Sequence, residues 1–271
     1  MTARAVREQT IRGESRVPRP SAVPEFYDTF LLHPRASGPG VCAVCHAAAA
    51  EGHPRCSACS EALAAHPHGT ADAVVPISIS VRREHLAAEL WRYKEIDDSD
   101  AKRVLQLRLA SLLGRFLAGH ERCVADAAGA EAFDLVTTIP STGGRARHPL
   151  REIVGSLVEA SASRYADLLA ANPARAADRL AHADRFTVLE GPSTAELAGA
   201  NVLVIDDTWT RGGHAQSASI ALKAAGVRVV GIVVLGRYLD PDYPGNGAYL
   251  RQVRAARFSW ERCCVHREGL W

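Results

Sequence analysis

Residues 202–217, VLVIDDTWTRGGHAQS, are the stretch that indicates the fold class most clearly. An apolar run at residues 201–205 predicts a buried strand, and it leads directly into two carboxylates, Asp206 and Asp207. A turn rich in threonine and glycine follows, and the alanine-rich residues 215–225 predict a helix. A buried strand that passes through a tight turn into a helix is typical of one unit of a parallel α/β sheet.

The same alternation of strands and helices continues on both sides of this stretch. Short apolar runs predict further strands at residues 74–81, 134–140 and 227–235. Apolar residues at helical spacing predict helices over residues 86–93, 104–116 and 150–169, and residues 179–185 are expected to form a solvated helical face. We therefore expect an α/β fold with a parallel sheet whose strands are joined by helical crossovers.

The composition is that of a globular protein. Of the 271 residues, 47% are hydrophobic and 23% are charged, which excludes a wholly disordered chain. No run of about 18 apolar residues exists, so we expect no membrane span. The N-terminal stretch has no apolar run that could serve as a signal-peptide core, and we expect a cytoplasmic protein. A net charge of +2 neither favours nor excludes a nucleic-acid partner.

Changes in composition along the chain predict four parts. Residues 1–25 are polar and aperiodic, and we expect a disordered tail. Residues 26–69 are poor in large apolar side chains and contain four of the seven cysteines, which predicts a small module that needs a cross-link. Residues 70–240 hold the predicted strands and helices, and residues 241–271 are expected to form an extension packed on that domain.

The cross-link in the small module is predicted to be a metal ion. Cys42 and Cys45 form one C-x2-C pair, and Cys56 and Cys59 form another after ten residues. Two such pairs allow four thiolates to surround one Zn²⁺ tetrahedrally, and a closed site of this kind is structural. The alternatives are two disulfides or free buried thiols. A reducing compartment disfavours the disulfides.

Two details of the cysteine pattern stay open. His46 and His53 lie close enough in sequence to replace one of the four thiolates as a ligand. Cys263 and Cys264 are adjacent and have no C-x2-C partner, and Cys123 is predicted to be a buried small apolar residue.

The acidic strand end and its turn predict a ligand site. Ligands of open α/β sheets bind beyond the carboxyl ends of the strands, and a glycine-rich turn that opens a helix suits a phosphate. Asp206 and Asp207 could accept hydrogen bonds from vicinal hydroxyls, directly or through Mg²⁺. A ribose 5-phosphate carries both groups at a suitable spacing. Acids at strand ends also occur in P-loop enzymes and receiver domains, but the GxxxxGK[ST] motif is missing here.

The stretch IDDTWTRGGHAQS resembles the phosphoribosyl-pyrophosphate (PRPP) motif of type I phosphoribosyltransferases. The order of a cysteine module, the segment WRYKEIDDSDAKRVLQLRLASLLGRFL at residues 91–117 and this motif is similar to the ComF branch, the competence-protein F family. IPSTGGRARHPLREIVGSLV at residues 139–158 matches the middle segment of that family loosely. The resemblance implies a Rossmann-like phosphoribosyltransferase domain behind an N-terminal zinc module.

Carried over to this chain, the resemblance implies roles for named residues. Asp206 and Asp207 would hold the ribose 2- and 3-hydroxyls. The cradle for the 5-phosphate would be Thr210, Arg211, Gly212, Gly213 and His214, and the pyrophosphate loop would be Ser141, Thr142, Gly143, Gly144 and Arg145. Arg211 and His214 replace two threonines of the motif, and residues 147–150 replace an expected Arg-Gly-Phe-Asn run.

Three functions follow as hypotheses. The first is a Mg²⁺-dependent phosphoribosyltransferase that uses PRPP and an acceptor that the sequence does not specify. The second is an inactive protein that binds PRPP or a nucleotide as a signal. The third, which the ComF resemblance implies, is an accessory protein that handles single-stranded DNA or contacts the competence machinery during DNA uptake. Lys94 is a candidate to neutralise the leaving pyrophosphate, with a solvated helix-end charge as the alternative.

Overall fold

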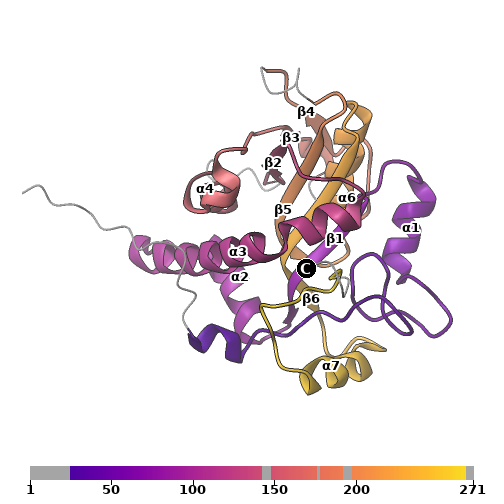
Figure 1. Cartoon of the computed structure of the whole chain (residues 1–271), viewed down its shortest axis with the longest axis vertical. Coiled ribbons are helices and arrows are strands. Elements are labelled where there is room, and N and C mark those ends of the chain that lie inside the picture. The colour runs from indigo at the N-terminus through magenta and orange to yellow at the C-terminus, as the bar shows by residue number, and fades with distance from the viewer. Residues whose placement is uncertain (1–24, 142–147, 176–177, 192–196, 267–271) are drawn as a thin grey trace, which may run out of the picture.

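The computed structural model describes residues 25–141, 148–175, 178–191 and 197–266. These residues form a central sheet of four parallel strands in the order β1-β6-β5-β2 (Figure 1). The strands are β1 (Ala73–Val81), β2 (Leu135–Thr138), β5 (Asn201–Trp209) and β6 (Val229–Leu239). The predicted α/β class with a parallel sheet is therefore confirmed.

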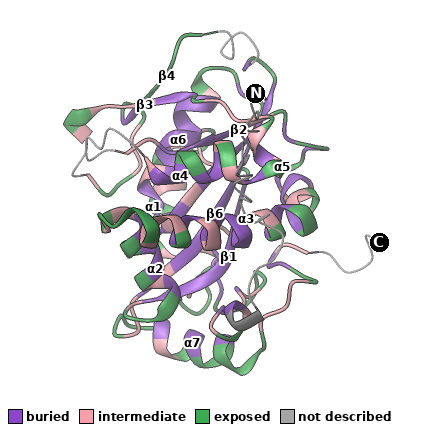
Figure 2. Ribbon diagram, turned by 90° about the vertical axis from the view of Figure 1, so that its left-hand side faces the viewer, coloured by how far each residue is buried: buried purple, intermediate pink, exposed green. Residues whose placement is uncertain are grey.

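Helices and loops cover both faces of the sheet, and the strands are therefore apolar on both faces. The long helix α3 (Ser99–Ala128) packs over one face together with α2 (His85–Glu95), and α6 (Gly213–Ala224) lies over the other. Alternate residues of β5 reach the two cores: Leu203 and Ile205 join α3, while Val204 joins the core that contains α6. Figure 2 shows the buried strands between these layers. This is the pattern of near-continuous burial expected for a parallel sheet.

Both ends of the described chain contribute to the two cores. Tyr27, in the short helix η1 (Glu25–Thr29), packs with α2 and α3, and its hydroxyl donates a hydrogen bond to Glu89. The cysteine-bearing segment leads into α1 (Ser57–Ala65) and packs with the α6 side of the sheet, as does α7 (Asn246–Ala255). The predicted tail lies outside the described residues except for Glu25, which begins η1.

The predicted helix over residues 150–169 is confirmed only in part, as three short helical pieces that end at Ala162. This segment forms α4 (Pro149–Glu152), a π-helical turn η2 (Ile153–Leu157) and α5 (Glu159–Ala162), and then pairs with the edge of β2. A side chain on Gly155 would come within 2.8 Å of the Tyr165 ring, which shows how closely the chain folds back there. Val136 donates to the Arg164 carbonyl and accepts from Ala166. The open edge of β2 therefore recruits backbone that the local pattern assigns to a helix.

The predicted solvated helix at residues 179–185 is wrong. These residues form turns between η3 (Pro173–Arg175) and the short strand β4 (Phe186–Val188), which pairs with β3 (Leu169–Ala171) in an antiparallel hairpin. Arg185 is fully buried and donates to three backbone carbonyls of the preceding turns. A buried guanidinium that satisfies free carbonyls holds this segment in a non-helical path.

Two strands are longer than predicted. Strand β5 continues through both aspartates to Trp209, so the turn begins only at Thr210. Strand β6 likewise continues to Leu239. Trp209, 1% exposed, fills the core beneath the turn. Within the described ranges, no helix is both long enough and apolar enough to cross a membrane.

Candidate functional site

A cavity of about 730 Å³ opens at the carboxyl ends of the parallel strands. Because parallel strands end at the same edge, residues far apart in sequence meet there. The lining includes Ser80 from β1, Ser141 after β2, Asp206 and Asp207 from β5, and Tyr238 from β6. The turn and the start of α6 complete one wall, with Thr210, Arg211, Gly212, Gly213 and His214. The structure thus brings most of the predicted ligand residues to one cavity.

Asp207 is held by two side chains of α2. The Tyr93 hydroxyl donates to one carboxylate oxygen, and Lys94 Nζ lies 2.7 Å from the other. Asp207 is 4% exposed and Tyr93 is fully buried, so this contact joins α2 to β5 inside the core. Lys94 is an ion-pair partner that lines the cavity and is not a solvated helix-end charge.

The charge of Asp206 is compensated less well by neighbouring groups than the charge of Asp207 is. Its carboxylate accepts the backbone N–H of Asp207 at 2.9 Å. Burial and the neighbouring Asp207 charge raise the pKa of Asp206 to about 7, against a smaller lowering effect of Lys94. A raised pKa at the edge of a cavity marks a carboxylate that would gain from a cation or from hydroxyl donors.

The turn before α6 requires both of its glycines. Gly212 has a φ of 81°, and a side chain there would come within 2.1 Å of the Trp209 ring. A side chain on Gly213 would come within 2.3 Å of the Arg179 carbonyl oxygen. The two glycines let the turn fold tightly against both neighbours, and the first N–H groups of α6 lie at the cavity wall.

The turns at residues 178–185 form a second layer beside this wall. Arg185 donates to the Asp178 and Leu180 carbonyls at 2.9 and 3.0 Å and lies 3.1 Å from His214 Nε2. Since an arginine can only donate, Nε2 of His214 is the acceptor. Burial, reinforced by the Arg185 charge, lowers the pKa of His214. His214 therefore enters the cavity as a neutral ring at neutral pH.

We expect Gly213→Ala to disturb the cavity wall. The new methyl group would overlap the Arg179 backbone, which cannot move as freely as a flexible side chain, so the free energy of unfolding should fall by about 1–3 kcal/mol. Gly247→Ala in α7 is the matched control, because no atom lies within 4 Å of its added carbon. Urea unfolding measures both variants. Equal stability of the two variants would contradict the packing described for Gly213.

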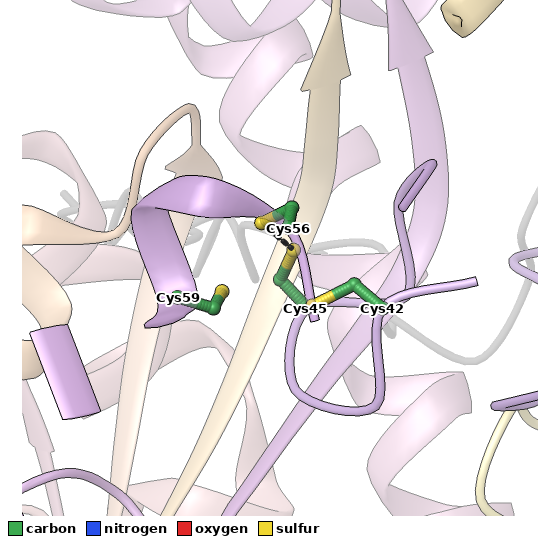
Figure 3. Close-up of side chains that lie close together, drawn as sticks. All are labelled: Cys42, Cys45, Cys56 and Cys59. Atoms are coloured by element: carbon green, nitrogen blue, oxygen red, sulfur yellow. Dashed lines mark hydrogen bonds between the residues drawn. The ribbon is translucent and has the colours of Figure 1, made fainter. Parts of the chain in front are cut away.

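The four predicted cysteines form a cluster (Figure 3). Their sulfur atoms all lie within 4.8 Å of one another, with Cys45 and Cys56 at 3.8 Å. Cys56 precedes α1 and Cys59 lies in its first turn. Hydrogen bonds from the other three thiols lower the pKa of Cys42. The cluster could hold a metal ion such as zinc.

His46 and His53 are not part of this cluster. His46 has a φ of 56°, which lets its N–H bond to the Cys42 carbonyl at 3.1 Å, and its ring contacts the Arg35 carbonyl. His53 contacts the Glu51 carbonyl. The four thiols are therefore the donor set at this cluster, and neither histidine replaces one of them.

Arg237 connects the cysteine cluster to the cavity wall. Its guanidinium donates to the carbonyls of Trp209 and Thr210 at 3.1 and 3.0 Å, at the point where β5 becomes the turn. Burial lowers the pKa of Arg237, but the thiols of Cys45, Cys56 and Cys59 more than offset this and leave it raised. The same cation thus faces the thiols on one side and the turn on the other.

Some predicted site residues have no described position, and some residues at the site were not predicted. Thr142, Gly143, Gly144 and Arg145, predicted for the pyrophosphate loop, lie outside the described residues. Five further residues at or beside the cavity were not predicted as site residues: Trp91, Tyr93, Arg179, Arg185 and Arg237. Only Arg237 carries a visible signal, since a charge interrupts the apolar run of β6. The chain matches no protein-family model, and no curated protein is similar to it.

Proposed function

We propose that this protein binds a ribose 5-phosphate ligand, PRPP foremost, and acts as a Mg²⁺-dependent phosphoribosyltransferase. The observation that carries the proposal is one cavity of about 730 Å³ lined by both Asp206 and Asp207 and by the glycine turn that begins α6. A ligand that carries a diol and a phosphate would satisfy both ends at once. The resemblance of the turn to the PRPP motif supports the same ligand.

The phosphate end of the ligand would lie at the start of α6. Backbone N–H groups there and the positive end of the helix dipole favour an anion. Thr210 and Arg211 are exposed at this wall and would add a hydroxyl and a guanidinium. His214, neutral as described, would contribute hydrogen bonding and no charge.

The diol end would lie at the aspartates, and their oxygen donors fit Mg²⁺. Asp206 is the better ligand, because Asp207 already accepts from Tyr93 and Lys94. Its raised pKa reports uncompensated charge, which a divalent cation would relieve. When bound, Mg²⁺ would supply positive charge for the pyrophosphate that leaves.

Transfer would displace pyrophosphate at the anomeric carbon. The lone pair of an acceptor forms a bond to that carbon while the carbon–oxygen bond to pyrophosphate breaks, and pyrophosphate leaves with the electron pair. Lys94, 27% exposed at its side chain, lies where it could release Asp207 and contact the leaving group. Trp91, 65% exposed at the rim, offers a flat apolar surface on which an acceptor ring could stack.

The test is a calorimetric titration of the full chain with PRPP, with and without Mg²⁺. We expect Mg²⁺-dependent binding that Asp206→Asn/Asp207→Asn weakens by at least about tenfold, the effect of losing charge-assisted contacts. Glu131→Gln is the control, an exposed acid at the opposite end of β2 from the cavity. A folded protein without PRPP affinity would overturn the proposal, and binding to single-stranded DNA with steep salt dependence would then favour an accessory role.

One observation favours binding without turnover as a second candidate. Asp207 is buried and held by both Tyr93 and Lys94, so reaching it requires the ligand to break an existing ion pair. A sensor would show PRPP affinity but no pyrophosphate release with any of a panel of purine, pyrimidine and amine acceptors. Release of pyrophosphate with one acceptor would establish the transferase.

We also propose that Zn²⁺ occupies the four-cysteine cluster. The four donors and their close spacing fit a closed structural site, and the segment that carries them has few large apolar residues of its own. The role of this ion would be to fold residues that pack against the sheet.

A further inference from the structure

A second group of metal-ligating side chains lies on the opposite side of the sheet from the four cysteines. His120 and Cys123 are one turn apart on α3, and Cys263 and His266 follow α7 near the end of the described chain. The donor atoms of His120, Cys123 and Cys263 all lie within 4.8 Å of one another. His266 Nδ1 lies 3.7 Å from Cys123 Sγ, across a sequence separation of 143 residues.

The two sulfur–nitrogen separations at Cys123 are close to those around a tetrahedral zinc ion, and His266 lies beside Cys123 without being within 4.8 Å of all three other donors. Zn–S bonds of about 2.3 Å and Zn–N bonds of about 2.0–2.1 Å place sulfur and nitrogen ligands about 3.5–3.6 Å apart. Cys123 Sγ lies 3.8 Å from His120 Nδ1 and 3.7 Å from His266 Nδ1. The proposed zinc ligands Cys45 and Cys56 show the same separation, 3.8 Å.

The orientation of His120 is that of a metal ligand. Its Nε2 lies 2.9 Å from the Trp260 carbonyl oxygen, and since a carbonyl can only accept, Nε2 carries the hydrogen. Nδ1 of the neutral ring then presents its lone pair to Cys123. Histidines that bind metals usually donate their other ring N–H to a carbonyl or carboxylate in this way, which fixes the ring. His120 is 2% exposed, so water does not compete for this arrangement.

The local backbone also brings each pair of ligands together. Residues three apart on a helix share a face, which places His120 beside Cys123. The His266 N–H donates to the Cys263 carbonyl at 3.1 Å, and this turn brings Cys263 and His266 close. Cys123, predicted as a buried apolar residue, is only half-buried and lies between two imidazole rings.

We propose that His120, Cys123, Cys263 and His266 bind a second Zn²⁺, which fastens the C-terminal segment to α3. The two thiolates and two imidazoles are a donor set that zinc accepts in structural sites. The segment also docks through Trp260, whose ring N–H donates to Asp28 at 2.7 Å and whose carbonyl contacts His120. The proposal is independent of PRPP binding.

Zinc stoichiometry tests the proposal. The full chain, purified with zinc under reducing conditions, should carry about two ions in native mass spectrometry, one for each donor set. Cys263→Ser should carry about one, and Cys264→Ser, which alters the adjacent buried cysteine outside the cluster, should keep about two. About one ion in the unaltered chain and the same number in Cys263→Ser would overturn the proposal.

Thiol alkylation gives a second measurement that needs no variant. With zinc present, Cys123 and Cys263 should alkylate at least about tenfold more slowly than after chelation, because a bound thiolate is a weaker nucleophile. A disulfide between these two cysteines would instead lower the mass by about 2 Da and block alkylation until a reductant is added. Either that disulfide or fast alkylation in the presence of zinc contradicts the metal site.

Discussion

If the four-cysteine cluster holds zinc as proposed, Cys45→Ser is expected to remove the ion and to unfold the segment that carries the cluster. Zinc supplies roughly 10–16 kcal/mol of apparent binding free energy to isolated modules of this kind, and binding there is inseparable from folding. In the whole chain the segment also packs on the sheet, so loss of the ion should remove only part of that free energy. We expect the free energy of unfolding to fall by about 5 kcal/mol or more. Thermal melting with zinc analysis of the folded fraction measures this.

The same substitution should also loosen the cavity wall. Arg237 faces Cys45 on one side and donates to the Trp209 and Thr210 carbonyls on the other, so a disordered cluster frees the guanidinium to move. Hydrogen exchange should increase at residues 41–59 and at residues 209–213. Cys264→Ala is the control, a buried cysteine outside the cluster. A zinc-free protein with unchanged melting and exchange would show that the cluster is not structural.

Asp206→Asn is expected to stabilise the protein and to weaken Mg²⁺-dependent PRPP binding. The pKa of Asp206 is raised to about 7 in the folded state, against about 3.9 for an ordinary aspartate. The folded protein therefore holds this proton more tightly than the unfolded chain does. As pH rises from about 4 to above 7, the folded state loses stability, because an uncompensated charge forms in it.

Asp206→Asn removes this loss of stability, so the effect of the substitution on the free energy of unfolding depends on pH. At pH 8 Asp206→Asn should raise the free energy of unfolding by about 1–2 kcal/mol, less than the full pKa shift implies because the carboxylate is partly exposed. At pH 4 the gain should vanish. PRPP binding by the unaltered protein should strengthen as pH rises through about 7, where Asp206 ionises.

Urea unfolding and calorimetry over pH 4 to 8 measure both effects on the same samples. Glu131→Gln again serves as control, since an exposed acid should change stability little at either pH. A variant that is less stable at pH 8 would contradict the electrostatic account of Asp206. Unchanged PRPP binding in the variant would remove Asp206 from the ligand site while leaving the stability argument intact.

The parts of the fold that depend on residues close together in the sequence were predictable from it. The parallel α/β class followed from alternating segments, because a strand buried on both faces leaves a short continuous apolar run and an amphipathic helix leaves a period of about 3.6 residues. The glycine turn beside Asp206 and Asp207 followed from chain continuity, since residues five or six apart cannot separate far. The same holds for each C-x2-C pair, whose two thiols lie on one tight turn or on the first turn of a helix.

Groups of residues close in sequence were therefore predictable, whereas the packing of distant segments set how these groups meet. The edge of β2 drew residues 164–166 out of a predicted helix, because an unpaired strand edge offers hydrogen bonds that no local pattern records. Arg185 is buried because three backbone carbonyls, those of Arg175, Asp178 and Leu180, accept from it. His120 and Cys123 meet Cys263 and His266 because the C-terminal segment packs against α3, and packing between distant segments leaves no spacing in the sequence.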